Sequence, residues 1–261
     1  MACLVGVVII GGISRIASIT DKVVPLMAIV YMLACLWIIL NNIVQLPSAI
    51  ATIFVGAFSP QAVGGGIVGV MVQGIRRSAF SNEAGVGSAA IAHSAARTEE
   101  PLREGIVALL EPLIDTIIIC NMTALVIIIT GTYQDSSIED GVLLTTNSFA
   151  TVADWFPIIL AIAVALFAFS TMISWSYYGE KAWEYLFGSG SILIYKSMFV
   201  FFVFVGAVVN LGAVLDFSDM MILAMSIPNL IGCYLLSGEV ASELKEYLER
   251  LSSGQITTFE S

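Results

Sequence analysis

Long apolar runs dominate the chain and limit what it can fold into. Residues Val23–Val44 form a run without a single charged side chain, and a helix needs about 20 apolar residues to cross a bilayer. Further runs, mostly apolar, cover Gly105–Thr130, Ala153–Tyr178, Ile192–Leu215 and Met220–Leu236. Because every backbone polar group in lipid must be paired within the protein, these runs predict an all-helical protein that crosses the membrane several times.

The composition argues against several classes of protein. Hydrophobic residues make up 58% of the 261 residues and charged residues 11%, against about half and a quarter in soluble domains. The spans use nearly the whole chain, which argues against a soluble enzyme with one membrane anchor. Ten Lys and Arg against twenty Asp and Glu form no basic patch for nucleic acid. A single histidine and scattered cysteines argue against a zinc site or a histidine-based triad, so we expect no enzyme.

Shorter segments complete the predicted organisation. Residues 1–12 are apolar but too short to cross a bilayer, so we interpret them as the end of a span. The piece 46–60 is also too short and is expected to lie at the interface or to fold back. Residues 238–261 contain a charged amphipathic helix, which we expect to lie along the membrane surface. The prediction is a transmembrane region over 1–237 and a cytoplasmic helix and tail over 238–261.

The run Val63–Ala95 departs from an ordinary span. Glycines at 85 and 87 follow Ser81, Asn82 and Glu83, and this composition predicts a broken helix near 81–88. Such a break is tolerated only inside a bundle or beside water, and transporters use it to bind carboxylates and cations. A packing seam between helices would explain the small residues but not Asn82 and Glu83. We therefore favour a binding site.

A second stretch, residues 167–188, carries hydroxyl groups at helical spacing. Ser170 and Ser174 lie four residues apart, as do Thr171 and Trp175, so each pair shares one helix face. Hydroxyl oxygens suit a hard monovalent cation, and Trp175 would wall a small apolar pocket. The alternative is that these hydroxyls only bond across helices or back to their own carbonyls, and it explains the spacing equally well.

Ionisable side chains inside spans are costly in lipid and often functional. The candidates are Arg76, Arg77, Glu83, Glu111 and Asp115. We expect an ion pair between one arginine and an intramembrane carboxylate, which would line or gate the path. A purely structural ion pair fits nearly as well.

Apart from Arg76 and Arg77, the basic residues lie in alternate connections. They are Arg15 and Lys22, Arg97 and Arg103, Lys181 and Lys196, and Lys245 and Arg250. The intervening connections carry acidic residues instead, among them Asp135, Asp216 and Asp219. Because basic loops stay cytoplasmic, we expect the Arg97–Arg103 loop and the C-terminus inside and the Gln134–Asp140 loop outside. This alternation requires that Val63–Ala95 count as one span.

Several stretches resemble a known family, the sodium:alanine (alanine/glycine:cation) symporters. They are FSNEAGVGSAAIAHSAA at 80–96, PLREGIVALLEPLIDTIIICNMTALVIIITG at 101–131, FAFSTMISWSYYGEKAWEYLFG at 167–188 and GGISRIASITDKVVPLMAIVY at 11–31. The resemblance implies a leucine-transporter-type fold, with two inverted repeats and a site at broken helices. It implies a symporter of the plasma (inner) membrane that imports alanine or glycine, with sodium as the coupling ion and no further cofactor.

The resemblance also assigns roles by position. It implies that the broken helix contacts the substrate through Phe80, Ser81, Asn82, Gly85 and Gly87. It implies that Thr171 and Trp175 face the amino acid, and that Ser170, Thr171 and Ser174 are sodium ligands.

Relatives carry several spans, including the first core helix, before the region where this chain begins. We therefore expect a missing N-terminal half as a partner, and we expect that this chain alone does not transport. The leading function is sodium-driven transport of small neutral amino acids. The competing interpretation is a truncated fragment that does not transport, or one half of a split transporter.

Overall fold

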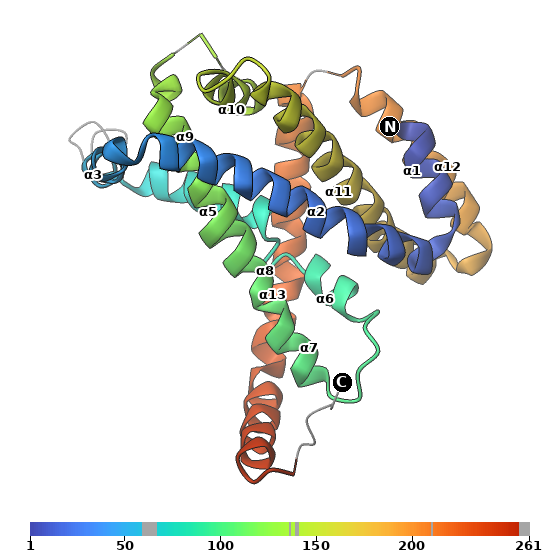
Figure 1. The fold of residues 1–261 in the computed structure, drawn as a ribbon. Helices are drawn as coiled ribbons and strands as arrows, with labels where there is room; N and C mark the ends of the chain where they lie inside the picture. Colours follow the sequence, from blue (N-terminus) through green and yellow to red (C-terminus); the bar gives the residue numbers. More distant parts are fainter. Residues whose placement is uncertain (59–66, 136, 139–140, 210, 256–261) are drawn as a thin grey trace.

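A computed structural model describes residues 1–58, 67–135, 137–138, 141–209 and 211–255. Helices and short connections build this described part (Figure 1). The elements are α1 (Ala2–Ile10), α2 (Gly12–Asn41), η1 (Ile43–Gln45), α3 (Leu46–Ala57), α5 (Ile67–Ser81), α6 (Ser88–His93), α7 (Pro101–Ala108), α8 (Leu110–Pro112), η2 (Leu113–Cys120), α9 (Asn121–Thr130), η3 (Thr132–Gln134), α10 (Gly141–Ala150), α11 (Phe156–Phe187), η4 (Ser189–Ser191), α12 (Ile192–Gly206) and α13 (Leu211–Ser252). The start of the predicted Val63–Ala95 span, and Glu139 and Asp140 of the predicted acidic loop, lie outside the described residues.

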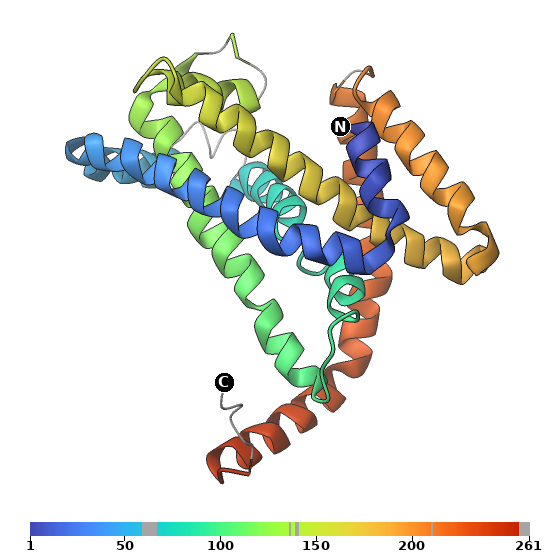
Figure 2. The same cartoon turned by 45° about the vertical axis from the view of Figure 1, so that its right-hand side comes forward.

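Helices α2 and α11 form the centre of the fold and lie side by side (Figures 1 and 2). A buried cluster that includes Ile38, Val126, Phe149 and Leu160 lies between these two helices, α9 and α10. A second cluster joins α1, α2 and α11, and α12 packs against α1. Because α11 contributes to both clusters, its rotation about its own axis is fixed. This rotation turns Trp175 toward the segment between α5 and α6, where its indole nitrogen contacts Glu83.

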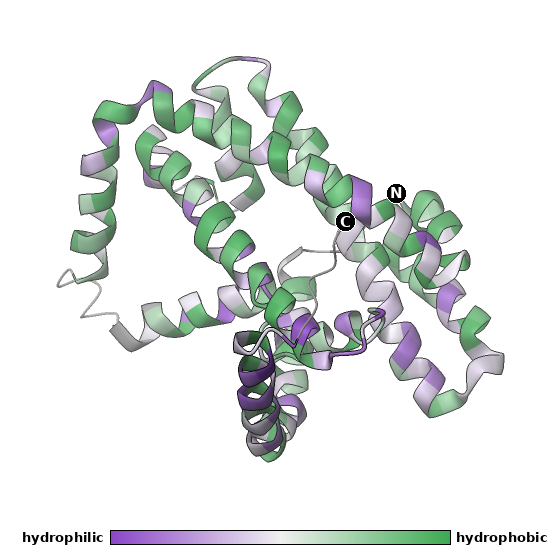
Figure 3. Ribbon diagram, turned by 60° about the horizontal axis from the view of Figure 1, so that its bottom comes forward, coloured by the Kyte–Doolittle hydropathy of each residue, from purple (hydrophilic) through white to green (hydrophobic). Residues whose placement is uncertain are grey.

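Five described stretches are long and apolar enough to cross a membrane. They are Gly12–Asn41, Pro101–Thr130, Phe156–Phe187, Ser189–Gly206 and Gly212–Ser252. Hydrophobic residues make up most of the helices (Figure 3), and many large ones are exposed, such as Leu4, Phe202 and Leu235. An apolar surface of this extent is what lipid solvates. The molecule is therefore an all-helical membrane protein.

The predicted start of the first full span is wrong. Helix α2 begins at Gly12, so Arg15 and Lys22, expected in a connection, lie within the helix. The polar stretch between them contains no proline or glycine that would stop a helix. Arg15 also reaches back and donates a hydrogen bond from Nη1 to the Val7 carbonyl at 3.0 Å.

The last predicted connection is also wrong. Helix α13 begins at Leu211 and continues to Ser252, through Pro228, so Asp216 and Asp219 lie in a helix rather than in a loop. Charge alone indicated a connection there, but Asp219 is 2% exposed and is paired with arginines of α5. The amphipathic segment predicted from residue 238 is the end of this same helix. It contacts α7 at one end of the molecule, while the segment after α9 lies at the other end (Figure 1).

Candidate functional site

The backbone between α5 and α6 departs from helical geometry at three residues. Glu83, Gly85 and Gly87 have positive φ angles of 55°, 82° and 104°, which glycine adopts freely and glutamate rarely does. The Glu83 carboxylate accepts a hydrogen bond from the Trp175 indole nitrogen at 2.6 Å and another from the Ser88 hydroxyl. These two contacts hold Glu83 in a conformation that its own backbone disfavours.

The residues before the turn contact the span Pro101–Thr130. The Ser81 hydroxyl donates to the Asp115 carboxylate, and the Asn82 side-chain nitrogen donates to Thr116 Oγ1 at 2.7 Å. Asp115 and Thr116 lie in the π-helical segment η2. Such a segment changes which side chains face a neighbour and is frequent at functional sites. The composition of this stretch does not predict a π-helical segment.

The glycines of the turn contact α13. Asn229 donates a hydrogen bond from its side-chain nitrogen to the Gly85 carbonyl at 3.0 Å. A Cβ atom added at Gly87 would lie 3.2 Å from atoms of the Asn229 side chain. Asn229 thus satisfies a backbone carbonyl that the break leaves without a helical partner. Sequence reasoning missed Asn229, although an asparagine beside Pro228 in an apolar helix is itself a polar signal.

Two cavities flank the turn. The first, which we call the Asp115 cavity, has a volume of about 360 Å³. It is lined by Val24, Met27, Ala28, Ser81, Glu83, Glu111, Ile114, Asp115, Ile119, Phe167, Ser170, Thr171, Ser174, Trp175 and Tyr178. The second, the Phe217 cavity, has a volume of about 400 Å³ and lies on the α13 side. The two cavities share Ser81, Glu83, Thr171 and Trp175, which therefore form the wall between them.

Most of the predicted site residues line one of these cavities. Phe80 lines the Phe217 cavity, and Ser170 and Ser174 line the Asp115 cavity. The Ser170 hydroxyl donates to the Phe167 carbonyl of its own helix at 3.0 Å, which leaves its oxygen lone pairs free to accept. Asn82 instead bonds to Thr116, and Gly85 and Gly87 face α13.

Neither arginine lines the Asp115 cavity or the Phe217 cavity. Arg76 and Arg77 each place Nη2 against Asp219 Oδ2, at 2.5 Å for Arg77, and Arg76 lies 3.9 Å from Asp216. The ion pair therefore forms with a carboxylate of α13, and neither Glu83, Glu111 nor Asp115 takes part in it. Its position joins α5 to α13 just before the broken segment.

No Lys or Arg is among the side chains that line the Asp115 cavity, whereas three carboxylates are. A cavity with this charge attracts cations. Its hydroxyl and carboxylate oxygens are the ligands that hard cations prefer. The arrangement suits a small cationic group, either a metal ion or an ammonium.

Comparison with known proteins gives a consistent assignment. The family model described as "Sodium:alanine symporter family" matches residues 1–261. Similar proteins include the "Sodium/alanine symporter AgcS" of Methanococcus maripaludis, 42% identical over 252 residues, which covers 95% of this chain and 56% of that protein. The "Probable sodium/glutamine symporter GlnT" of Bacillus subtilis is 35% identical, with 97% and 54% covered.

A "Sodium/proton-dependent alanine carrier protein" from Bacillus sp. is 31% identical, with 98% of this chain and 62% of that protein covered. The chain thus spans little more than half the length of the curated relatives it matches. Since the family model covers all of its residues, the chain belongs to the sodium:alanine symporter family, a family of multi-pass membrane transporters and not of enzymes.

Proposed function

We propose that this chain carries the broken helix and much of the ligand site of a sodium-coupled symporter for alanine or glycine. The symporter has the leucine-transporter-type fold of two inverted repeats and acts by alternating access in the plasma membrane. Its C-terminus is cytoplasmic.

The observation that carries this proposal is the wall shared by the two cavities. Ser81 and Glu83 come from the break, and Thr171 and Trp175 come from the facing side of α11. An unwound segment opposite an intact helix is the arrangement in which transporters bind a small solute near the membrane midplane. The cavity volumes, about 360 and 400 Å³, lie within the range of small-molecule sites.

The amino acid and the sodium ion each have matching groups in this arrangement. The carboxylates of the Asp115 cavity favour the substrate ammonium and the sodium ion. We assign Ser170, Thr171 and Ser174 as candidate sodium ligands, because their oxygens line the same cavity wall. Trp175 and Phe80 supply apolar surface for the substrate side chain.

A second interpretation is that the chain works only as one half of a split transporter, or is a fragment that does not transport. It is favoured by the low burial of the spans Pro101–Thr130 and Gly212–Ser252, in which only 11% and 6% of the most apolar stretch is buried. It is tested by the co-expression experiment at the end of the Discussion.

The site itself is tested by uptake of labelled alanine into membrane vesicles. For this test the chain is produced together with the segment of the methanococcal relative that it does not match. Thr171→Ala should lower sodium-dependent uptake about tenfold, because a hydroxyl in a dry site contributes on the order of 1.5 kcal/mol. Thr146→Ala, which removes an exposed hydroxyl of α10, is the control. Equal uptake and equal sodium dependence in both variants would place the site elsewhere.

A further inference from the structure

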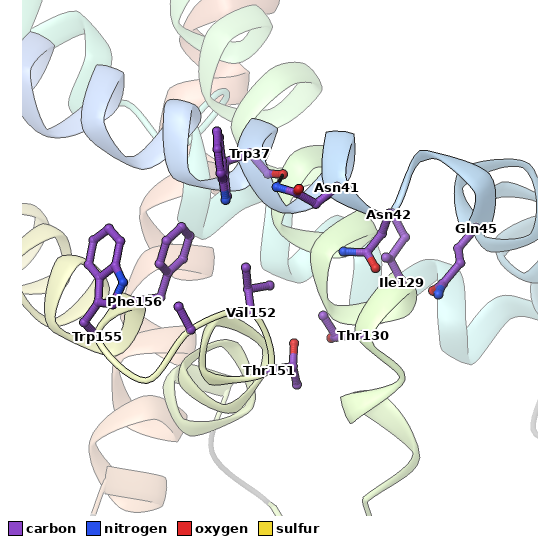
Figure 4. Close-up of a pocket in the computed structure, with 11 residues that line it drawn as sticks. Trp37, Asn41, Asn42, Gln45, Ile129, Thr130, Thr151, Val152, Trp155 and Phe156 are labelled. Atoms are coloured by element: carbon purple, nitrogen blue, oxygen red, sulfur yellow. Dashed lines mark hydrogen bonds between the residues drawn. The ribbon is translucent and has the colours of Figure 1, made fainter.

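A cavity larger than the Asp115 and Phe217 cavities lies away from the broken helix. It has a volume of about 860 Å³ and lies between the end of α2, η1, the end of α9 and the connection from α10 to α11 (Figure 4). It is lined by Trp37, Asn41, Asn42, Gln45, Ile129, Thr130, Thr151, Val152, Ala153, Trp155 and Phe156. We call it the Trp37 cavity. It shares no residue with the Asp115 or Phe217 cavity, and none of the residues singled out from the sequence lines it.

The amide and hydroxyl groups of this cavity donate to nearby carbonyls of their own chain. Asn41 and Asn42 donate from Nδ2 to the carbonyls of Trp37 and Ile38, at 2.8 and 2.9 Å. The Thr130 hydroxyl donates to the Val126 carbonyl at 2.8 Å. In the same way, the Thr151 hydroxyl donates to the Ser148 carbonyl at 2.7 Å. Since a hydroxyl has only one proton to donate, both threonines offer only lone pairs to a ligand. The two asparagine carboxamides offer their oxygens as acceptors, and each keeps one further Nδ2 proton.

The aromatic side chains add electron-rich faces. Trp37 and Trp155 line the cavity and are 57% and 58% exposed. Phe156 meets Trp155 in an edge-on contact with ring centroids 4.8 Å apart. None of the lining residues carries a charge. Indole faces attract cations and do not attract anions.

From this chemistry we propose that the Trp37 cavity binds a primary ammonium group. Such a group brings three donors to the oxygens of Asn41, Asn42 and the two threonines, and its charge faces the two indole rings. The lining has no cationic side chain to pair with a carboxylate, so recognition rests on the ammonium end. The ligand is either a free amine or amino acid, or the ethanolamine headgroup of a lipid. This binding does not depend on the transport proposed above.

The preference of the Trp37 cavity for a positive charge can be tested at Gln45. Within the part of the chain that the structure describes, its carboxamide has no hydrogen-bond partner, and it lies at the rim of the cavity (Figure 4). Gln45→Glu and Gln45→Lys therefore add opposite charges without removing an existing contact. The first should tighten ammonium binding roughly fivefold, the size expected for an exposed ion pair. The second should weaken it by at least as much.

The experiment uses the full chain in nanodiscs of phosphatidylglycerol, labelled with 5-fluorotryptophan. The four tryptophans give separate fluorine resonances, which single Trp→Phe variants assign. Ethylammonium chloride should shift the Trp37 and Trp155 resonances with saturation, and sodium propionate should not. The Trp175 resonance reports on both the Asp115 and the Phe217 cavity. Ammonium binding in either of these is therefore not mistaken for binding in the Trp37 cavity.

A second arm in phosphatidylethanolamine nanodiscs distinguishes the two sources of the ammonium. A lipid headgroup would shift Trp37 and Trp155 before any addition and block further change. A free amine would titrate alike in both lipids. Either pattern supports the proposal. The proposal is overturned if neither resonance responds to ethylammonium in phosphatidylglycerol, if propionate acts equally, or if both Gln45 variants change binding in the same direction.

Discussion

Glu83 is the residue at which the local backbone and the fold conflict most directly. Its φ of 55° is the only positive φ of a non-glycine residue in the described part of the chain. A conformation of this kind costs on the order of 1–3 kcal/mol and persists when surrounding contacts outweigh it. Here the contacts are those with Trp175 and Ser88. The indole that walls both cavities therefore also holds the turn, which links the shape of the site to the break.

Gly87→Ala tests how tightly this turn is specified. The substitution adds a Cβ at a φ of 104° and places it 3.2 Å from Asn229. We expect a loss of stability of about 1–3 kcal/mol, measured as a fall of several degrees in the Tm of the detergent-solubilised protein. Gly105→Ala is the matched control, because that glycine lies in α7 and its Cβ would meet no atom within 4 Å. Equal Tm values for the two variants would contradict the role assigned to the turn.

At this scale the sequence predicts which residues line the site better than it predicts their partners. The spacing of Ser170, Thr171, Ser174 and Trp175 places them on neighbouring faces of one helix, and the structure brings all four to the Asp115 cavity. The contact between Ser81 and Asp115 was not predictable. It depends on how two spans pack and on a π-helical segment that has no signature in composition.

At the scale of elements, α13 determines how the broken helix is held. It reaches α5 through Asp219, the turn through Asn229 and the segment before α7 through Arg250. Sequence reasoning divided this helix because Asp216 and Asp219 resembled loop residues. Charges inside a span are tolerated when they are paired, and the partners come from a helix more than a hundred residues away in sequence. The pattern of one sequence does not show which distant residues pair with these carboxylates.

The contact between Glu100 and Arg250 should fix the end of α13. The Arg250 guanidinium donates to both Glu100 oxygens, at 2.7 and 2.9 Å, and this hydrogen bonding lowers the pKa of the Glu100 carboxyl below its ordinary 4.5. Because the pKa is lowered in the folded state, the contact stabilises the docked helix at neutral pH. That stabilisation is lost as the pH falls through the lowered pKa.

Spin labels at Ala96 and Ser253 would report this docking as a distance. We expect a narrow distribution at neutral pH, and a broad one both in strong acid and in Glu100→Gln at neutral pH. Glu99→Gln is the control, since among the described residues Glu99 has no ion-pair partner. If Glu100→Gln keeps the narrow distribution, other contacts hold the end of α13.

At the scale of the whole molecule, the loop charges predict its orientation in the membrane. The segment before α7 and the end of α13 lie together, and the segment after α9 lies at the opposite end (Figure 1). A cysteine at Ser137 should therefore react with an impermeant thiol reagent added outside intact cells, and one at Ser253 should not. The four native cysteines, of which Cys3, Cys120 and Cys233 are exposed, must first be replaced. The reverse labelling pattern would overturn the orientation.

The last prediction concerns what the chain does by itself. Helices α2 and α11 pack well, because 33% and 28% of the residues in their most apolar stretches are buried. In the spans Pro101–Thr130 and Gly212–Ser252 the corresponding shares are only 11% and 6%. These two poorly covered spans supply Glu111 and Phe217, which line the candidate site and remain exposed. A carboxylate left exposed within a membrane span costs several kcal/mol, so we expect the site to need a further wall. We expect no sodium-dependent alanine uptake from the chain expressed alone in cells without alanine carriers. Co-expression with the segment of the methanococcal relative that it does not match should restore uptake, and the Thr171→Ala variant should lower the restored activity. Uptake by the chain alone would refute this expectation, and it would show that the cavities described here are sufficient for transport.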